Sequence, residues 1–294
     1  MNTPNSRLPV TAVVLTFNEE KNLPKCLDSL AQEVAQIMVV DSFSTDRTVE
    51  IARNYTDNII AHQYDGHPQQ WDWVLENAPM SQEWIFAIDA DFVVTPALWN
   101  DLRKKLATAD SSTNAYYVRH REVFRGRHIR FGGIYPNHWL RIFRKGCVSV
   151  DLNELVDVHF YVNGRIGTIE YDVIEKNYKD DNIFFWIQKQ NNFARRQAKE
   201  ELGRKNNATK SPGAANLFGN REERKLALKN IWYRLPLYFR PLIYFCYRYI
   251  FRLGFLDGRQ GFVYHFTQGL LYRLLVDINL EELIKEEKER SIDL

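Results

Sequence analysis

The sequence contains few cysteines and no long uncharged apolar run. Its three cysteines, Cys26, Cys147 and Cys246, are an odd number outside any paired motif, which fits buried thiols in a reducing cytosol. No stretch reaches the roughly 18 uncharged apolar residues of a membrane-spanning helix. Residues 1–9 are short and polar, so we predict no signal peptide. These absences predict a cytoplasmic protein that is at most peripheral to a membrane.

Glycine is absent where many nucleotide-binding proteins need it. The run Val10–Thr16 is β-branched and predicts a buried first strand, but the turn that follows, Phe17–Glu20, contains no glycine. This argues against both a P-loop and a dinucleotide fingerprint, so a phosphate would have to be bound by a metal and side chains. The seven histidines show no metal-ligand spacing, and we expect most of them at the surface or in loops.

A continuous apolar run from Trp84 to Ile88 ends in two carboxylates, Asp89 and Asp91. The run predicts a strand that is buried on both faces. Because side chains alternate along a strand, we expect both carboxylates on one side, with the small Ala90 leaving room for a ligand. Two hard oxygen ligands at a strand end suit a divalent cation that also holds a phosphate. The alternative for an isolated pair is a helix cap or a turn, and the surrounding pattern favours the cation.

Strands and helices alternate through the first 110 residues. The predicted strands are 10–16, 37–40, 58–61 and the one that carries Asp89, and the predicted helices pass through 23–30 (capped by Asn18), 49–51, 69–76 and 96–106 (capped by Thr95). This alternation is typical of an α/β fold, with a mostly parallel sheet flanked by helices. Ligands of such sheets bind beyond the carboxyl ends of the strands, where Thr16, Asp41, Asp89 and Asp91 all fall.

The pattern changes after residue 111. Short strands and aromatic loops are predicted from Ala115 to Val162, interrupted by an acidic turn at Asp151–Glu154. A long helix is predicted over Asp180–Leu202, ending at Gly203. Residues 203–220 are polar and contain proline and glycine, so we predict a loop or linker there.

Aromatic and basic residues are interleaved in the carboxyl-terminal third. Fourteen aromatics lie between Ile231 and Leu275, and residues 221–294 are predicted to be helical. Amphipathic helices of this composition lie in membrane interfaces, with their arginines toward anionic lipid. The alternative is a hairpin of core helices whose arginines reach the surface, and both interpretations stay open. No recognisable RNA-binding motif accompanies the segment, so we predict no nucleic-acid partner.

Three motifs in this order, Val14–Glu20, Val39–Thr48 and Ala87–Asp91, resemble the family 2 glycosyltransferases of the GT-A fold. Leu140–Arg144 and Gly254–Gly261 look like the subgroup of lipopolysaccharide core glucosyltransferases, so the resemblance spans nearly the whole chain. It implies inverting transfer of a sugar from a nucleotide diphosphate donor, commonly a UDP-sugar, to an acceptor hydroxyl. The acceptor implied is a cell-envelope glycolipid or polysaccharide.

The resemblance also implies roles for individual residues. The donor-contacting positions are Thr16, Asn18, Glu19, Asp41, Gln70 and Asp89. Thr16 and Asp41 would contact the nucleoside, and Asp89 would face the ribose or the metal. Asp91 would ligate Mg²⁺ or Mn²⁺, which neutralises the charge that grows on the departing diphosphate.

Inversion by direct displacement needs one general base to take the acceptor proton, and Glu154 is the candidate. The subgroup has a His-Glu pair here, whereas this chain has Asn153-Glu154, with Asp151 and Asp157 as competing carboxylates. The subgroup also tends to have a histidine before the long helix, where this chain has Ile174–Tyr178 without one. Both departures from the subgroup's sequence bear on what the resemblance implies about the acceptor, rather than on what it implies about the donor chemistry.

A GT-A domain over residues 1–202 is implied, with a nucleotide-sugar half (1–110) and an acceptor half (111–202). In the acceptor half, Arg141 and Arg144 are candidates for binding acceptor phosphate or the donor diphosphate, unless they are surface charges. Two other functions remain open. One is a nucleotidyltransferase, which also pairs a nucleotide with acidic metal ligands, and the other is a non-catalytic protein that binds a nucleotide sugar or carbohydrate.

Overall fold

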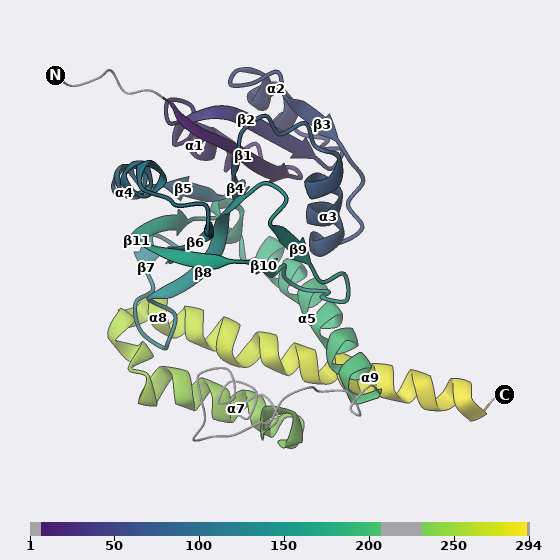
Figure 1. Ribbon diagram of the computed structural model, residues 1–294. Helices are drawn as coiled ribbons and strands as arrows, with labels where there is room; N and C mark the ends of the chain where they lie inside the picture. Colours follow the sequence, from purple (N-terminus) through teal and green to yellow (C-terminus); the bar gives the residue numbers. More distant parts are fainter. Residues whose placement is uncertain (1–6, 207–230, 293–294) are drawn as a thin grey trace. The chain divides into compact units, whose positions relative to one another are not determined.

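The computed structural model describes residues 7–206 and 231–292, and the chain forms two compact units (Figure 1). Unit 1 comprises residues 1–130 together with 134–186, and unit 2 comprises residues 131–133 together with 187–294. Most of the predicted linker, 203–220, lies outside the described residues. The domain limits inferred from the sequence therefore stay a prediction.

Unit 1 is built on one large sheet with the strand order β3-β2-β1-β4-β8-β6-β11-β5 (Figure 1). The first four strands along the chain are β1 (Leu8–Thr16), β2 (Val34–Asp41), β3 (Ile59–Ala61) and β4 (Trp84–Asp89), and neighbours among them pair in parallel. The other strands are β5 (Phe92–Val94), β6 (Thr113–Phe124), β7 (Arg127–His128, paired with β6), β8 (Asn137–Arg144) and β11 (Arg165–Glu175). β8 runs antiparallel to both β4 and β6, whereas β11 is parallel to β6. The predicted α/β class is confirmed.

Helices cover both faces of the parallel strands. They are α1 (Leu23–Asp28), α2 (Thr48–Arg53), α3 (His67–Asn77) and α4 (Pro96–Ala107). Two successive residues of β1 illustrate the division: Val14 packs in a core cluster with residues of α1, α2 and α4, whereas Val13 packs in a second cluster with Trp71 of α3. Because alternate side chains of a strand point to opposite faces, a strand covered on both sides needs an uninterrupted apolar run.

Three predicted helix boundaries can be compared with the structure. Thr95 caps α4 as predicted, and its hydroxyl accepts a hydrogen bond from the backbone N–H of Leu98 at 3.3 Å. The predicted cap at Asn18 is wrong, because α1 begins only after Asn22 and Asn18 adopts a left-handed φ of 53° in the preceding turn. The predicted stop at Gly203 is also wrong, since α5 (Ile183–Asn206) continues through it. A glycine costs a helix only about 1 kcal/mol, which is too little to end a long one.

A separate two-stranded sheet carries the acidic turn. It consists of β9 (Val148–Val150) and β10 (Phe160–Val162), which pair antiparallel. The ring of Phe160 lies 5.2 Å from that of Trp71 in α3 and 4.8 Å from that of Phe143 in β8. The hairpin is thus anchored on the core beneath α3, and its loop, residues 151–159, lies beside the start of that helix.

Unit 2 is helical in its described residues. It contains most of α5, followed by α7 (Phe239–Cys246), η2 (Tyr247–Phe251), η3 (Gly254–Asp257), α8 (Gly258–Tyr264), η4 (His265–Leu271) and α9 (Tyr272–Ile292). Ala194 and Ala198 of α5 pack with Val276 and Leu280 of α9. None of the helices that the structure describes is long and apolar enough to cross a membrane.

His265 is completely buried in unit 2, where it packs between two glycines. A Cβ on Gly132 would lie 2.1 Å from the ring Cε1, and a Cβ on Gly254 would lie 2.6 Å from Cδ2, so neither position has room for a side chain. In the part of the chain that the structure describes, neither ring nitrogen has a hydrogen-bond partner. Burial, together with the charge of Arg248, lowers the pKa of His265 to about 4.

We expect acid to destabilise the protein through His265. Above pH 6.5 the ring is neutral in both the folded and the unfolded chain. Between that pH and about 4 only the unfolded chain binds the proton. The free energy of unfolding therefore falls by about 1.4 kcal/mol for each unit by which the pH is lowered. Urea unfolding at about pH 7 and pH 5 should show the wild type losing about 2 kcal/mol more than His265→Gln. Equal losses in the two proteins would contradict this.

Candidate functional site

Asp41, the last residue of β2, is buried and fully engaged by hydrogen bonds. The hydroxyl of Thr16, at the end of β1, donates to its Oδ1 at 2.9 Å. The backbone N–H of Ser44 donates to Oδ2 at 2.8 Å, and the Ser44 hydroxyl donates to Oδ1 at 2.5 Å. Adjacent parallel strands thus fix one carboxylate at their common carboxyl edge.

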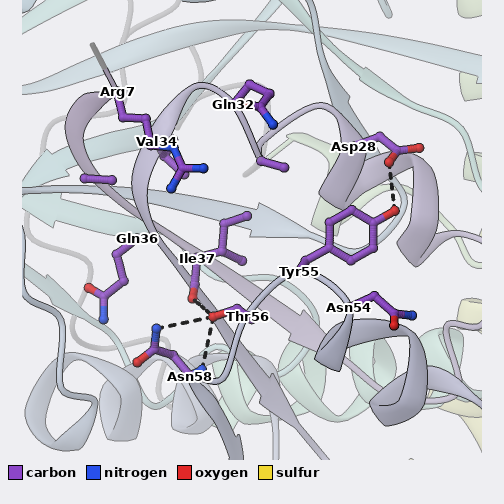
Figure 2. Close-up of a pocket in the computed structure, with 12 residues that line it drawn as sticks. Arg7, Asp28, Gln32, Val34, Gln36, Ile37, Asn54, Tyr55, Thr56 and Asn58 are labelled. Carbon is purple, nitrogen blue, oxygen red and sulfur yellow. Dashed lines mark hydrogen bonds between the residues drawn. The ribbon is translucent and has the colours of Figure 1, made fainter.

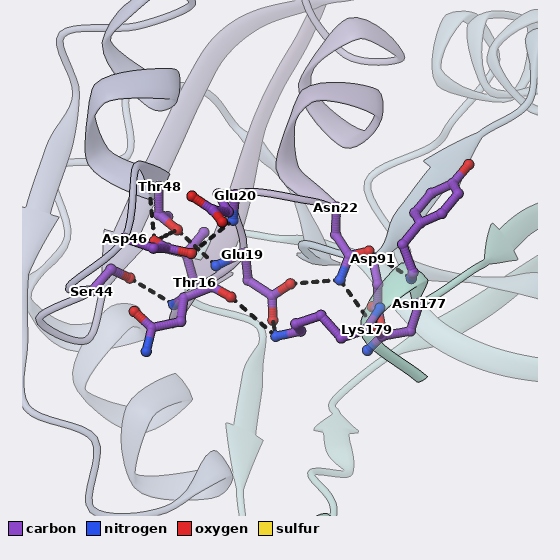
Figure 3. A network of polar contacts seen from close by, with 12 residues as sticks. Thr16, Glu19, Glu20, Asn22, Ser44, Asp46, Thr48, Asp91, Asn177 and Lys179 are labelled. Atoms are coloured by element: carbon purple, nitrogen blue, oxygen red, sulfur yellow. Dashed lines mark hydrogen bonds and ion pairs between the residues drawn. The ribbon is translucent and has the colours of Figure 1, made fainter. Parts of the chain in front are cut away.

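The turns that follow β1 and β2 are joined side by side (Figure 3). The backbone N–H of Asn18 donates to the Ser44 hydroxyl at 2.8 Å, and that of Thr45 donates to the Asn18 side-chain oxygen, also at 2.8 Å. The backbone N–H of Glu20 donates to Asp46 at 3.1 Å. Burial acts to raise the pKa of Asp46, but hydrogen bonds, of which those from Thr48 are the strongest, outweigh it and lower the pKa. The two turns therefore form one preorganised polar surface.

Glu19 has protein partners on both carboxylate oxygens (Figure 3). Its Oε1 accepts from Lys179 Nζ at 2.5 Å, and its Oε2 accepts from Asn22 Nδ2 at 2.7 Å. Lys179 lies in the short turn η1 (Tyr178–Asp181) that follows β11. Glu19 thus ties the first turn of the chain to a segment that follows the last strand of the sheet.

Asp91 is held by the same segment. Its Oδ2 accepts a hydrogen bond from Asn177 Nδ2 at 3.1 Å, and its backbone carbonyl accepts from the N–H of Lys176 at 3.0 Å. Asn177 in turn accepts from Asn22 Nδ2 at 3.1 Å, so a chain of amides connects Asp91 to Glu19 (Figure 3). Asn177 lies within the stretch Ile174–Tyr178 and is a residue that the sequence did not single out for any role.

Asp89, the last residue of β4, faces a different set of partners. Its Oδ2 accepts from Arg141 Nη2 at 2.9 Å, and its Oδ1 lies 3.7 Å from His67 Nε2. The Arg141 side chain is buried, and its guanidinium lies over the rings of Phe92 and Trp139. Among the described residues, Arg141 Nη1 has no hydrogen-bond partner. A buried guanidinium with one unused donor is suited to a phosphate oxygen.

The buried thiol of Cys26 lies within the electrostatic influence of three of the candidate carboxylates. Its pKa is raised first by burial and then by the charges of Asp91, Asp89 and Glu19. Its sulfur also lies 3.8 Å from the backbone carbonyl of Asp89, to which it donates. The thiol therefore stays protonated near neutral pH and is not a nucleophile. The charges of all three carboxylates therefore act on one buried thiol.

The strand alternation from which we predicted a common direction for Asp89 and Asp91 stops at Asp89. β4 ends at Asp89, and Ala90 and Asp91 form a turn before β5, so strand alternation does not set the direction of Asp91. Within residues 7–206 and 231–292, no group of three or more His, Cys, Asp or Glu side chains is arranged to hold a metal by itself. Mg²⁺ that keeps waters and phosphate oxygens needs only one or two carboxylates, so the lack of a three-ligand group among these residues does not argue against such an ion.

Glu154 lies in the loop between β9 and β10, where residues of its own hairpin hold it. Its Oε1 lies 2.8 Å from His159 Nδ1 and accepts from the Tyr161 hydroxyl at 3.1 Å. Its Oε2 accepts from the backbone N–H of His159 at 3.0 Å. The sequence has Asn153 where the subgroup has a histidine beside the carboxylate, but the fold brings His159 to Glu154 from further along the loop.

His67 connects this loop to Asp89. Besides its contact with Asp89, its Nδ1 lies 3.9 Å from Asp157 Oδ1. The neighbouring Gln69 donates from Nε2 to the backbone carbonyl of Leu152 at 3.0 Å. The loop that carries Glu154 therefore lies at the same edge as Asp89. A search for metal-ligand spacing could not find His67, because its partners are far away in the sequence.

Gln70 and Arg144 have different positions relative to this edge. Gln70 is buried, its Oε1 lies 2.8 Å from His62 Nδ1, and its Nε2 donates to the Ser42 hydroxyl at 3.5 Å, just after β2. Arg144 pairs with Trp84 in the strand register, at the opposite end of β4 from Asp89. There its guanidinium pairs with Glu83 and lies 4.5 Å from the Trp84 ring. The fold thus brings Gln70, but not Arg144, toward the other candidates.

A cavity of about 590 Å³ lies at the other edge of the sheet (Figure 2). It is lined by Arg7, before β1, by Val34 and Gln36 at the start of β2, and by Tyr55 and Asn58, before β3. These are the amino ends of the parallel strands. Because ligands of parallel sheets bind beyond the carboxyl ends, this cavity is not the candidate site.

The fold and the site define a class of protein. A parallel sheet carries Thr16, Asp41 and Asp89 at the ends of adjacent strands, and a turn with Asp91 and a loop with Glu154 lie at the same edge. This is the α/β arrangement, with polar residues at the carboxyl ends of parallel strands, that the sequence motifs predicted. The model of the family described as Glycosyl transferase family 2 matches residues 11–165, more than half of the chain. The chain belongs to glycosyl transferase family 2.

Similar proteins have been named from several bacteria. The lipopolysaccharide core biosynthesis glycosyltransferase LpsC of Rhizobium meliloti is 31% identical over 55% of this chain and 60% of its own length, so the match spans less than two thirds of that relative. An uncharacterized glycosyltransferase of Rickettsia typhi is 22% identical over 92% of this chain and 88% of its own. Glucosyl-3-phosphoglycerate synthase from Mycobacterium tuberculosis, solved with Mg²⁺ and UDP, is 21% identical over 38% of this chain and 43% of that chain, with a TM-score of 0.33.

Proposed function

We propose that the protein is a metal-dependent inverting glycosyltransferase. It transfers a sugar from a nucleotide diphosphate donor, a UDP-sugar, to a hydroxyl of a cell-envelope glycolipid or polysaccharide such as lipopolysaccharide core, at the inner face of the cytoplasmic membrane. Family membership and the name of the relative LpsC support this proposal. The observation that carries it is the polar network at the carboxyl edge, which links Asp41, Glu19 and Asp91 through the turns after β1 and β2 and the end of β11.

The donor nucleoside binds over Thr16 and Asp41 in this proposal. Asp41 is already oriented by three donors, so it needs no reorganisation when a base approaches. Asn18 and Glu19 use their side chains on protein partners and act by holding the turn in shape. Gln70 supports the turn after β2 through Ser42.

The diphosphate would lie at Asp89 and Asp91, which would hold Mg²⁺ or Mn²⁺. When bound, such an ion neutralises the negative charge that develops on the leaving diphosphate. Asn177 fixes the carboxylate of Asp91, and Arg141 fixes that of Asp89. The unused Nη1 donor of Arg141 binds a phosphate oxygen.

Glu154 takes the proton from the acceptor hydroxyl. The acceptor oxygen then forms a bond to the anomeric carbon on the face opposite the diphosphate, whose bond to the sugar breaks, and the configuration inverts. His159 and Tyr161 hold the Glu154 carboxylate in place for this step. General base catalysis of this kind contributes a factor of roughly 10² to 10⁴ to the rate.

Calorimetric titration tests the donor site first. UDP should bind in the micromolar range in the presence of Mn²⁺, whereas GDP and CMP bind more weakly. Omitting the metal or replacing Asp91 by asparagine should weaken UDP binding more than about tenfold, because the diphosphate then meets carboxylates without a cation between them. Asp57→Asn, which changes an exposed carboxylate before β3, is the matched control and should bind as the wild type does. Absence of nucleotide binding under every condition would refute the proposal.

Turnover separates the proposal from the two alternatives. A glycosyltransferase hydrolyses its UDP-sugar slowly when no acceptor is present and releases UDP. A nucleotidyltransferase would instead release pyrophosphate from a nucleoside triphosphate. A protein that only binds nucleotide sugars would show metal-dependent binding with no release of UDP.

A further inference from the structure

A stripe of apolar side chains is exposed along one helix of unit 2. Nearly half of the large apolar side chains that are exposed in the described residues lie between 239 and 266. On the helix formed by α7 and η2, the exposed side chains recur at the three- and four-residue spacing that places them on one side, namely Phe239, Leu242, Ile243, Tyr247 and Ile250. Phe251, at the end of this helix, is 75% exposed. Soluble surfaces seldom expose so many neighbouring apolar groups without a partner.

A second exposed stripe adjoins the first. Phe255 of η3 and Phe262 of α8 are exposed, and their rings lie 6.3 Å and 5.7 Å from that of Tyr249 in η2. Phe266 of η4 is exposed as well, and its ring lies 6.2 Å from that of Phe245 in α7. The exposed residues of α7, η2, η3, α8 and the start of η4 therefore form one surface, the aromatic face.

The ionic groups of the aromatic face all have the same sign. Between residues 239 and 266 the exposed charged side chains are Arg252 and Arg259. The carboxylate in this segment, Asp257, is buried and accepts a hydrogen bond from the backbone N–H of Phe131 at 2.9 Å. Two further cations, Arg240 and Arg248, are also buried. The aromatic face thus presents apolar groups and cations without an exposed anion.

We propose that the aromatic face binds the surface of an anionic lipid bilayer. Aromatic and aliphatic side chains enter the region between headgroups and acyl chains, and Arg252 and Arg259 bind lipid phosphates. A second copy of the chain is a poorer partner, because a two-fold contact would bring the arginines of both copies together with no exposed carboxylate in this segment to pair with them. The inference concerns binding alone and does not depend on the transfer reaction proposed above.

Flotation of the full chain with vesicles tests this inference. Vesicles of phosphatidylcholine mixed with phosphatidylglycerol should bind the wild type at least about tenfold more tightly than phosphatidylcholine alone. The double variant Ile250→Glu, Phe251→Glu should bind the mixed vesicles at least about tenfold more weakly. It removes apolar side chains that would be buried in the bilayer, and its carboxylates are repelled by the anionic lipid. The double variant Arg252→Glu, Arg259→Glu should lose binding to mixed vesicles by a similar factor and leave binding to neutral vesicles unchanged.

A matched control lies on unit 1. Tyr171→Glu replaces an exposed aromatic of β11 and should float as the wild type does. All substituted side chains are exposed, so unchanged thermal midpoints are expected and show that the variants fold. The inference is overturned if the wild type does not bind mixed vesicles, or if neither double variant binds less. A dimer in sedimentation that Ile250→Glu, Phe251→Glu dissociates would also overturn it, because a second copy would then cover the aromatic face. None of these outcomes tests UDP binding, so a failure of the lipid-binding inference would not contradict the proposed donor site.

Discussion

Glu154→Gln should lower the rate of sugar transfer by a factor of about 10² to 10⁴ and leave metal-dependent UDP binding unchanged. Glutamine has nearly the same shape as glutamate but cannot take the proton of the acceptor hydroxyl. Binding of UDP should be preserved because the partners of Glu154 are His159 and Tyr161 in its own hairpin, not the carboxylates at the end of β4. Initial rates with a UDP-sugar and calorimetry with UDP, measured on the same preparations, check both parts.

Two further variants in the loop between β9 and β10 test whether the effect is specific to Glu154. Asp151→Asn removes a competing carboxylate whose Oδ1 accepts from the backbone N–H of Asn153 at 2.9 Å, and it should retain most of the activity. His159→Gln removes the imidazole beside Glu154, and it should lower transfer less than Glu154→Gln does, because the Tyr161 hydroxyl and the backbone N–H of residue 159 still hold the carboxylate. Transfer at the wild-type rate by Glu154→Gln would show that the base has been assigned to the wrong residue.

The carboxyl edge could be predicted because parallel strands make it a local property of the sequence. Each of the strands β1, β2 and β4 is an apolar run that stops at a polar residue, namely Thr16, Asp41 and Asp89. In a parallel sheet these ends must meet at one edge, so no knowledge of long-range packing is needed. The alternation of side chains along a strand could not be extended to Asp91, because β4 had already ended at Asp89 and Asp91 lies in a turn.

The residues that the sequence did not reveal reach the site through long-range pairing. Asn177 and Lys179 follow β11, which lies beyond β8 and β6 in the sheet, and no local pattern predicts that this strand ends beside the turn after β4. His67 is likewise defined only by where Asp89 and Asp157 lie. Amide and imidazole side chains of this kind carry no periodic signal, so they appear only when the register of the whole sheet is known.

The carboxyl-terminal segment shows the same limit. The interleaved aromatics and arginines were compatible with helices packed in a core or with an exposed apolar face. In the structure some of these arginines are buried and others are exposed. Arg240 and Arg248 are buried, whereas Arg252 and Arg259 are exposed. The π-helical turns η2 and η4 shift the residues that follow them relative to an α-helical count, so a fixed spacing rule could not assign each arginine. The expectation that most histidines lie at the surface failed for His120 and His265, which are buried.

Arg240→Met should cost about 3 to 5 kcal/mol of stability, because it removes the cation from a buried ionic triad. Arg240 Nη2 lies 2.8 Å from Glu201 Oε2 of α5, and Arg240 Nε donates to Asp277 Oδ1 of α9 at 2.6 Å. All three side chains are about 1% exposed, so water cannot compensate for the lost partner. Arg240 also lies 5.1 Å from the Trp232 ring, which shields the cation further. The prediction is checked by urea unfolding at neutral pH.

The loss of stability in Arg240→Met should come mainly from leaving the buried carboxylates of Glu201 and Asp277 without a cation, and not only from the loss of their attraction to Arg240. A buried ion pair is nearly balanced by the desolvation of its charges, whereas a single buried charge is not, so neutralising all three positions should be far less harmful than changing one. Arg240→Met combined with Glu201→Gln and Asp277→Asn should therefore recover a large part of the stability that Arg240→Met loses. Lys285→Met, which breaks an exposed pair with Glu281, is the matched control and should cost at most about 0.5 kcal/mol. If the triple variant is as unstable as Arg240→Met, packing by the arginine stem stabilises unit 2 and its charge does not.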